Sequence, residues 1–468
     1  MNNLKLAVRN LIRNRRRSLT TIFAMVIGMT ALLLFGGFIS SIYSGLQTGI
    51  VQTQGHLHIY KEGYLEFGPS RPTDYYIDDY ENIISQINKD DFLKQRIKVI
   101  TPVVNLAGIA GNYSADSSKT FIGSGVIPSD KNKMGTWDQY GLGQNQKPLS
   151  INDNNTTQGV VGVGMAKMLG LCESLIIPDC KDRPVEIVKG KKDEEVDEQV
   201  LALSSLLEEE NQQESDSKKK SVQIDLLAST GSGAPNVVSL SIINARKMPN
   251  KVLDDSYVTM HLTQAQKLVF ADDSRVSSLI IQLKKSEMIK ETQAHLSKYL
   301  KANVKKQTFE VKNYGEFNTE FFQIIDMFIV IFIFIALMIS LVVLFTTVNT
   351  LTMSVMERIS EIGSLRAMGL RRSAVRWQFL LEGAVIGVAG ATLGIIVSII
   401  ITLVFNQSGF SWSPPGSVDS SNLKILLFTN PLLLIGAWIL MTMVATVSSL
   451  LPARYASKMN IVNAIRNN

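Results

Sequence analysis

The 468-residue sequence predicts an α-helical membrane protein with four transmembrane helices and one mixed α+β domain outside the membrane. Charged residues make up only 19% of the chain, against about 25% in an average soluble domain. They are absent from four stretches of roughly 30 residues or more, which are Ser18–Tyr60, Met327–Met356, Gly383–Val418 and Ile425–Ala453. The long segment between the first two stretches carries charge at an ordinary density. A single soluble enzyme is therefore excluded.

The lengths of the uncharged stretches fit membrane-spanning helices. A helix that rises about 1.5 Å per residue needs about 20 apolar residues to cross a hydrocarbon core of about 30 Å. We therefore expect transmembrane helices at 19–45, 325–350, 381–405 and 426–451. The stretches are longer than this minimum, so some helices are expected to extend beyond the lipid.

Positive charge indicates which side of the membrane each segment faces. Residues 1–17 carry six Lys or Arg and no acid, and the loop 352–380 and the tail 452–468 are also basic. Under the positive-inside rule these segments are cytoplasmic, so the domain 46–320 and the short loop 406–424 lie on the other side. We expect a multi-pass protein of the bacterial cytoplasmic (inner) membrane with cytoplasmic termini and a periplasmic domain.

The net charge of +6 does not indicate a nucleic-acid partner. Residues 46–320 hold 32 basic and 36 acidic side chains, a net charge of −4, so the positive excess lies beside apolar segments. Within 1–18 an apolar helical face opposes a basic one, formed by Leu4, Val8, Leu11 and Ile12 against Lys5, Arg9, Arg13 and Arg16. This pattern predicts a cytoplasmic amphipathic helix on anionic membrane lipid. A basic flank that stops the first span accounts for most of the same features.

The domain 46–320 alternates short strand and helix patterns. β-Branched runs bounded by turn residues predict strands at 55–60, 98–104, 119–127, 238–243, 256–260 and 277–283. Helical periodicity predicts helices at 79–87, 166–171, 262–270 and 285–302. The segment 190–220 is rich in charged and polar residues, and we interpret it as a polar surface insertion.

The sequence contains no recognised catalytic or metal-binding motif. G-x-S-x-G, H-E-x-x-H and P-loop patterns are absent. His56 and His58 share one face of a strand, but two ligands do not make a metal site. Cys172 and Cys180 lie eight positions apart, and the sequence leaves open whether a disulfide joins them. We expect a non-catalytic chain with no metal or cofactor of its own.

The loop between the second and third spans combines apolar and charged residues. Its pattern predicts a short amphipathic helix with an apolar face formed by Met356, Ile359, Ile362 and Leu365. Glu357 and Glu361 lie one turn apart, and Gly369 is expected to end the helix. Acids gain nothing at an anionic lipid surface, so these glutamates favour a protein partner with basic groups.

The stretch Met356–Gly369, M-E-R-x-x-E-I-G-x-L-R-A-x-G, resembles the coupling helix of the MacB/FtsX/LolC–LolE superfamily of ABC transporter permeases. The opening V-R-N-L-I-R-N-R-R-R-S-L resembles the N-terminal helix of that superfamily. The ending P-A-R-Y-A-S-K-M-N-I-V-N-A-I-R resembles its C-terminal tail. The resemblance covers residues 1–45 and 320–468 in motif, and implies a periplasmic domain of the MacB-like core type.

The resemblance implies a permease dimer, either homodimeric or heterodimeric, in which each subunit docks a separate cytoplasmic ATPase that binds ATP and Mg. The residues that form or shape the docking helix would be Met356, Glu357, Arg358, Glu361, Ile362, Arg366 and Gly369. ATP-driven motion would reach the periplasmic domain by mechanotransmission. The domain would then export or extract an envelope substrate, such as a lipoprotein, lipid, peptide or amphipathic drug.

Two functions remain open at this stage. The chain is either a transport subunit, with a periplasmic adaptor or substrate protein as a further partner, or an FtsX-like signal transmitter that controls a periplasmic partner such as a cell-wall hydrolase.

The third span also carries Gly383, Gly387, Gly390 and Gly394 at G-x-x-x-G spacing. Small residues allow close helix packing in lipid, either within one subunit or between two.

Overall fold

The computed structural model describes residues 3–13, 15–68, 74–178, 180, 222–231, 233–248, 250–271, 274–412, 421–428 and 431–460. The chain divides into two compact units, which we describe separately. The membrane unit comes from Met1–Gln47, Asn318–Trp412 and Ser421–Asn468, and the domain unit mainly from Thr48–Phe317. The insertion expected at 190–220 lies outside the described residues, as does the end of the tail expected at 452–468.

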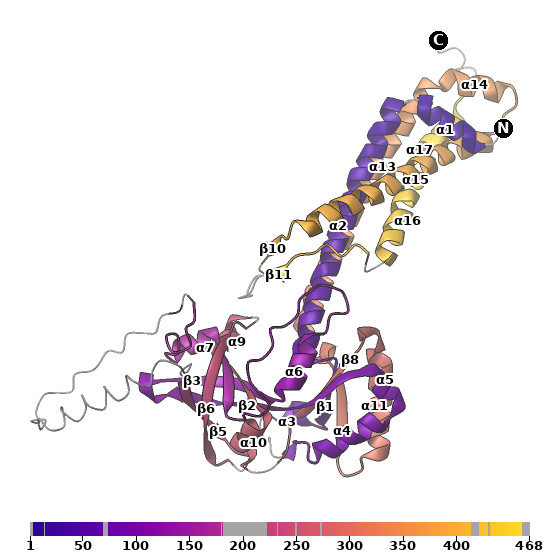
Figure 1. The fold of residues 1–468 in the computed structure, drawn as a ribbon. Helices are drawn as coiled ribbons and strands as arrows, with labels where there is room; N and C mark the ends of the chain where they lie inside the picture. Colours follow the sequence, from indigo (N-terminus) through magenta and orange to yellow (C-terminus); the bar gives the residue numbers. More distant parts are fainter. Residues whose placement is uncertain are drawn as a thin grey trace, which may run out of the picture. The chain divides into compact units, whose positions relative to one another are not determined.

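The membrane unit is built from helices. They are α1 (Asn3–Arg13), α2 (Arg15–Gln54), α13 (Thr319–Glu357), α14 (Ile359–Ala367), α15 (Arg372–Gln407), α16 (Pro431–Ser448) and α17 (Leu450–Lys458). Two short strands, β10 (Ser411–Trp412) and β11 (Ser421–Asn422), pair after α15. Figure 1 shows α1, α14 and α17 at the same end of this unit. Among the described residues, four helices are long and apolar enough to cross a membrane: α2, α13, α15 and α16 with α17.

These four helices contain the expected spans, with one shifted boundary. The 40 residues of α2 and the 39 of α13 correspond to about 60 Å each, well beyond the hydrocarbon thickness. Both helices are therefore longer than one crossing of a membrane requires. The fourth span begins at Pro431 rather than at 426. Proline is favoured at the first helical position because the amide that it lacks would have no partner there.

Four glycines place α15 against two other helices. A Cβ atom on Gly383 would lie 2.7 Å from Cβ of Ser449, and one on Gly387 would lie 3.1 Å from Cβ of Ala445. The next two glycines face α2. A Cβ on Gly390 would lie 2.7 Å from Cβ of Met25, and one on Gly394 would lie 2.5 Å from Cβ of Met29. All four glycines are therefore used for packing within this chain.

The domain unit contains nine described strands. They are β1 (Leu57–Lys61), β2 (Ile97–Asn112), β3 (Ser117–Val126), β4 (Gln158–Gly162), β5 (Val222–Ser229), β6 (Pro235–Arg246), β7 (Tyr257–His261), β8 (Ser278–Leu283) and β9 (Phe309–Asn313). The six expected strands are confirmed. Three strands were not expected from sequence: β4, β5 and β9. The helices are α3 (Tyr64–Phe67), α4 (Tyr80–Lys89), α5 (Asp91–Arg96), α6 (Pro128–Gly135), α7 (Val163–Met168), α9 (Lys251–Ser256), α10 (Leu262–Phe270), α11 (Ile289–Asn303) and α12 (Tyr314–Phe317).

Strand pairing divides this unit into two parts that share β2. The pairings β2–β3–β7–β4–β6–β5 return to β2 and so close a ring of six strands. Beyond the ring, β2, β8, β1 and β9 form an antiparallel sheet in that order. Its strands and helices follow the β-α-β-β-α-β pattern of the split βαβ arrangement, with α4 and α5 in the first crossover and α11 in the second. Residues 104–112 of β2 pair with β3, and residues 97–103 pair with β8.

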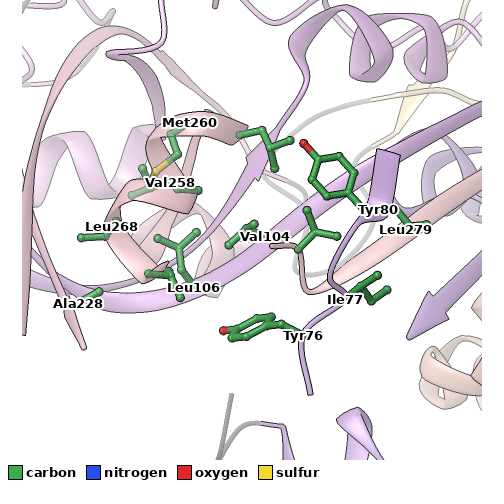
Figure 2. Packing of buried hydrophobic residues seen from close by; sticks show 14 of the residues in the cluster. Tyr76, Ile77, Tyr80, Val104, Leu106, Ala228, Val258, Met260, Leu268 and Leu279 are labelled. Carbon is green, nitrogen blue, oxygen red and sulfur yellow. The ribbon is translucent and has the colours of Figure 1, made fainter. Parts of the chain in front are cut away.

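One apolar core fills both parts of the domain unit. Strand residues such as Val104, Leu106, Val258 and Met260 are fully or nearly fully buried in it. Figure 2 shows these side chains together with Leu268 of α10 and Leu279 of β8, which lie in the same cluster. Because β2 contributes to the ring and to the sheet, the two parts share a continuous core.

Two histidines, His56 and His58, are buried in the domain unit. Nδ1 of His56 accepts a hydrogen bond from the Leu283 amide at 3.0 Å, and its ring meets Trp137 edge-on. His58 stacks on Tyr60 and lies 3.2 Å from its hydroxyl. Burial lowers the pKa of His56 to about 3 and that of His58 to about 4, so both are neutral at pH 7. In the described part of the chain, no group of three or more His, Cys, Asp or Glu is placed to hold a metal ion.

A disulfide joins Cys172 and Cys180 in the structure, with their Cα atoms 5.4 Å apart. Cys172 is buried at 1% exposure. The cross-link closes the turn that follows α7, just before the part of the chain that is not described.

Acidification is expected to destabilise the domain unit. An unfolded histidine binds a proton near pH 6.5, whereas the folded His56 and His58 do so only near pH 3 to 4. The unfolded state therefore binds more protons, and stability falls as the pH drops below about 6.5. We expect a loss of about 2–4 kcal/mol in the free energy of unfolding between pH 7 and pH 5. Thermal unfolding of the full-length protein in detergent at pH 7 and at pH 5 measures this loss of stability.

A His58→Phe variant provides the control. The ring contact with Tyr60 is retained and one titrating group is lost, so the pH dependence should fall by about half. An unchanged pH dependence would contradict the role given to His58.

The glycine contacts make a second prediction. Gly394→Ala should destabilise the membrane unit by about 1–3 kcal/mol, because its methyl group overlaps Met29. Gly436→Ala on α16 is the matched control, since a Cβ there meets no atom within 4 Å. Thermal unfolding in detergent compares the two variants. Equal stability of both would show that the close approach of α15 to α2 is wrong.

Candidate functional site at the break between α13 and α14

The chain changes direction at Arg358, the single residue between α13 and α14. Its backbone, at φ −114° and ψ 15°, interrupts the helix. The expected short helix is therefore divided, because Met356 and Glu357 form the last turn of α13 and only Ile359–Ala367 belong to α14. Neither Gly nor Pro lies at the break, so no local sequence pattern predicts it.

Gly369 ends the region as expected. It adopts a left-handed φ of +99°, and the amide of Leu370 bonds the carbonyl of Leu365 at 3.1 Å. This pattern is the one with which glycine commonly terminates a helix.

The two glutamates pair with arginines of this chain. Nη2 of Arg13, on α1, donates to Oε2 of Glu361 at 2.9 Å, and Arg17, on α2, forms an ion pair with Glu357. The hydrogen bond from Arg13 holds the pKa of Glu361 below its ordinary value, although partial burial acts in the opposite direction. The chain therefore supplies basic groups for both acids itself, so the two glutamates no longer argue for a basic partner protein.

Arg358 and Glu382 form a buried ion pair. Nη1 of Arg358 donates to Oε1 of Glu382 at 3.0 Å, and the two side chains are 8% and 1% exposed. Nδ2 of Asn10, on α1, donates to the same oxygen at 2.7 Å. Arg358 was expected to form or shape a docking helix, and its burial leaves only the shaping role. Glu382 was not expected, although it is the last acid before the uncharged stretch that begins at Gly383.

The apolar side chains of α14 and of Met368, which follows it, differ in exposure. Ile362 is 6% exposed and packs with Val355, Val375, Phe379, Ala453 and Ala456. Leu365 is 42% exposed and Met368 is 76% exposed. Ile362 and Leu365 lie three positions apart on α14, so the apolar face expected for this segment is buried at Ile362 and exposed at Leu365. Arg366 donates through Nη1 to the Met459 carbonyl, which ties the inner side of α14 to the end of α17.

The arrangement thus has an inner side and an outer side. The inner side holds Ile362, Arg366 and Arg358 against the rest of the membrane unit. The outer side presents Leu365 and Met368, followed by the exposed Arg371. No titratable group on the outer side is placed for catalysis, and the chemistry available there is that of a contact surface.

Comparison with known proteins concerns mainly the membrane unit. Residues 332–461 match the family model described as FtsX-like permease C-terminal. The ABC transporter permease YtrF of Bacillus subtilis (strain 168) is 36% identical over 120 residues, which are 25% of this chain and 28% of YtrF. The macrolide export ATP-binding/permease protein MacB of Shewanella sp. (strain W3-18-1) is 32% identical over 117 residues, or 25% of this chain and 16% of that protein.

A longer match is less similar. An uncharacterised ABC transporter permease of Methanocaldococcus jannaschii is 21% identical over 225 residues, which cover 48% of this chain and 54% of that one. The chain therefore spans about half or less of the length of these relatives.

Two solved structures show a weak similarity to this chain. The extracellular domain of the transporter YknZ, from Gram-positive bacteria, has a TM-score of 0.30 at 12% identity, over 55% of this chain and 99% of that domain. The periplasmic region of MacB from Actinobacillus actinomycetemcomitans has a TM-score of 0.33 at 10% identity, over 58% of this chain and 94% of that region.

The ion pair between α1 and α14 can be tested directly. Glu361→Gln should raise hydrogen exchange of the α1 amides by up to about fivefold, because a half-exposed pair contributes about 0.2–1 kcal/mol. The swap of Arg13→Glu with Glu361→Arg should return the exchange toward the wild-type rate. Unchanged hydrogen exchange of the α1 amides in both variants would contradict the pairing of Arg13 with Glu361.

Proposed function

The chain carries an FtsX-like permease domain over residues 332–461, and from this premise we propose that it is the membrane permease subunit of an ABC transporter of the MacB/FtsX type. In this proposal the protein lies in the bacterial cytoplasmic membrane with both termini in the cytoplasm. ATP and Mg are bound by a separate ATPase chain, and this chain performs no chemistry itself. The permease works as a dimer, homomeric or heteromeric.

The observation that carries the proposal is the exposed outer side of α14. Leu365 and Met368 present apolar surface to solvent at an end of the membrane unit where basic residues are concentrated. Exposed apolar side chains rimmed by charge are typical of protein contact sites. We assign this surface to the ATPase, with the buried Ile362 and the half-buried Arg366 holding the helix from the inner side.

Transmission of motion is supported by the continuity of the long helices. The 40 residues of α2 run without a break from Arg15 to Gln54, so its end lies in the sequence range of the domain unit. Tyr43 of α2 and Phe321 of α13 pack their rings at a centroid distance of 5.9 Å, near the ends of the two helices. We propose that ATP-driven motion of α14 reaches the domain unit along these helices.

The proposed work is export or extraction of an envelope substrate, such as a lipoprotein, lipid, peptide or amphipathic drug. The large domain unit supports transport over signalling, because a transmitter needs only a smaller contact surface. An FtsX-like transmitter that controls a periplasmic partner is the alternative. Identification of lipid or protein bound to the purified complex distinguishes the two, as does a neighbouring gene for a periplasmic adaptor or a hydrolase.

The docking surface is tested by Leu365→Asp combined with Met368→Asp. We expect recovery of the partner ATPase, co-expressed and purified with the permease, to fall at least tenfold, because charge is placed in an apolar contact. These residues are preferred to Glu357 and Glu361, whose substitution would break ion pairs within the chain.

Val252→Asp is the matched control, since Val252 is 74% exposed and lies in the domain unit. It should leave ATPase recovery unchanged. Full recovery with the double variant would refute the docking surface, and failure of the wild-type protein to bind the ATPase would refute the proposed function.

A further inference from the structure

We propose that Glu382 is a positioning residue that fixes the angle of the α13–α14 break, so that α1, α14 and α15 move as one block. This inference rests on the proposed function, because the block is what the ATPase would displace. Glu382 lies on α15, outside the segment that resembles a coupling helix, and touches neither the proposed docking surface nor any substrate.

The geometry places one carboxylate at the meeting point of three elements. Oε1 of Glu382 accepts from Asn10 of α1 at 2.7 Å and from Arg358 at 3.0 Å. Arg358 is itself the break, since it ends α13 and begins α14. The side chain of Arg358, which determines the direction of α14, is therefore held by Glu382 of α15. The same carboxylate oxygen also holds Asn10 of α1.

Burial makes the ion pair of Arg358 with Glu382 difficult to replace. Glu382 is 1% exposed and Arg358 is 8% exposed, so neither charge has water as an alternative partner. Removal of one member of a buried ion pair leaves the other without compensation, which is strongly unfavourable. Without Glu382, the guanidinium of Arg358 must turn toward water or toward Glu361, whose Oε2 lies 3.5 Å from its Nε. Either movement changes the backbone at the break and releases α14.

The flanking ion pairs extend the block to α2. Arg17 pairs with Glu357, the last residue before the break, and Arg13 pairs with Glu361, after it. These pairs are about half exposed and are individually weak. One of these pairs lies on each side of the break, and the buried pair of Arg358 with Glu382 between them keeps both in place. A displacement of α14 is therefore passed to α1 and the start of α2, in addition to α13.

The experiment compares Glu382→Leu, Glu382→Gln and a control. Gln keeps an acceptor oxygen for Asn10 and Arg358 without the charge, whereas Leu removes both. Glu320→Leu, which removes an exposed carboxylate from the first turn of α13, is the matched control. Spin labels at Arg9→Cys on α1 and Met368→Cys beyond α14 report the distance between the two helices by electron spin resonance, on the full-length permease alone in lipid nanodiscs.

A second measurement uses the unlabelled variants with the partner ATPase. We expect one narrow distance distribution in the wild type and in Glu320→Leu, a broad one in Glu382→Leu, and an intermediate one in Glu382→Gln. With Glu382→Leu, the kcat of permease-stimulated ATP hydrolysis should fall at least fivefold, while the KM for ATP and the amount of bound ATPase stay unchanged. Glu382→Gln should recover part of the stimulation.

The outcomes separate the inference from the proposed function. A narrow distribution in Glu382→Leu, or in Glu382→Gln if the Leu variant does not fold, overturns the tie. A broad distribution with undiminished stimulation overturns the role in coupling, as does a loss of ATPase binding that accounts for the lower rate. If the distributions change as expected but the wild-type permease binds no ATPase, the proposed function fails and the structural tie stands.

Discussion

The cost of placing charge in hydrocarbon is the constraint on which the membrane unit depends. Its long helices keep their ionisable groups toward the ends, where Glu357 of α13 pairs with Arg17 of α2. Glu382 borders the apolar part of α15 and is held by Asn10 and Arg358. Because these partners come from other helices, satisfying one buried carboxylate also fixes how those helices meet.

The same helix, α15, makes both kinds of close contact in the membrane unit. Its glycines receive α16 and α17 near the N-terminal half and α2 farther along, through contacts such as Gly383 with Ser449 and Gly394 with Met29. The carboxylate of its Glu382 accepts hydrogen bonds from Asn10 of α1 and from Arg358 at the break after α13. Van der Waals packing and a buried ion pair are both short-range, so α15 acts as the element around which the unit is assembled. The outer side of α14 is left free of these contacts and exposes apolar surface.

In the domain unit, one long strand performs a comparable role. β2 pairs with β3 and β5 in the six-strand ring, and with β8 in the split βαβ sheet. The apolar core therefore continues from one part to the other, with neutral His56 and His58 at its edge. Six strands were evident from their β-branched runs. The closure of the ring was not, because it depends on pairings between strands that are distant in sequence, such as β5 with β2 and β4 with β6.

The sequence by itself determined the membrane spans, most strands of the domain, the stop at Gly369 and the likeness of the loop to a coupling helix. These features follow from local composition and periodicity, which a single segment contains. The tertiary structure alone decided the break at Arg358, the pairing of both loop glutamates with Arg13 and Arg17, and the use of the α15 glycines within the chain. Each of these depends on which distant side chain lies within a few ångströms, and local pattern carries no information about that.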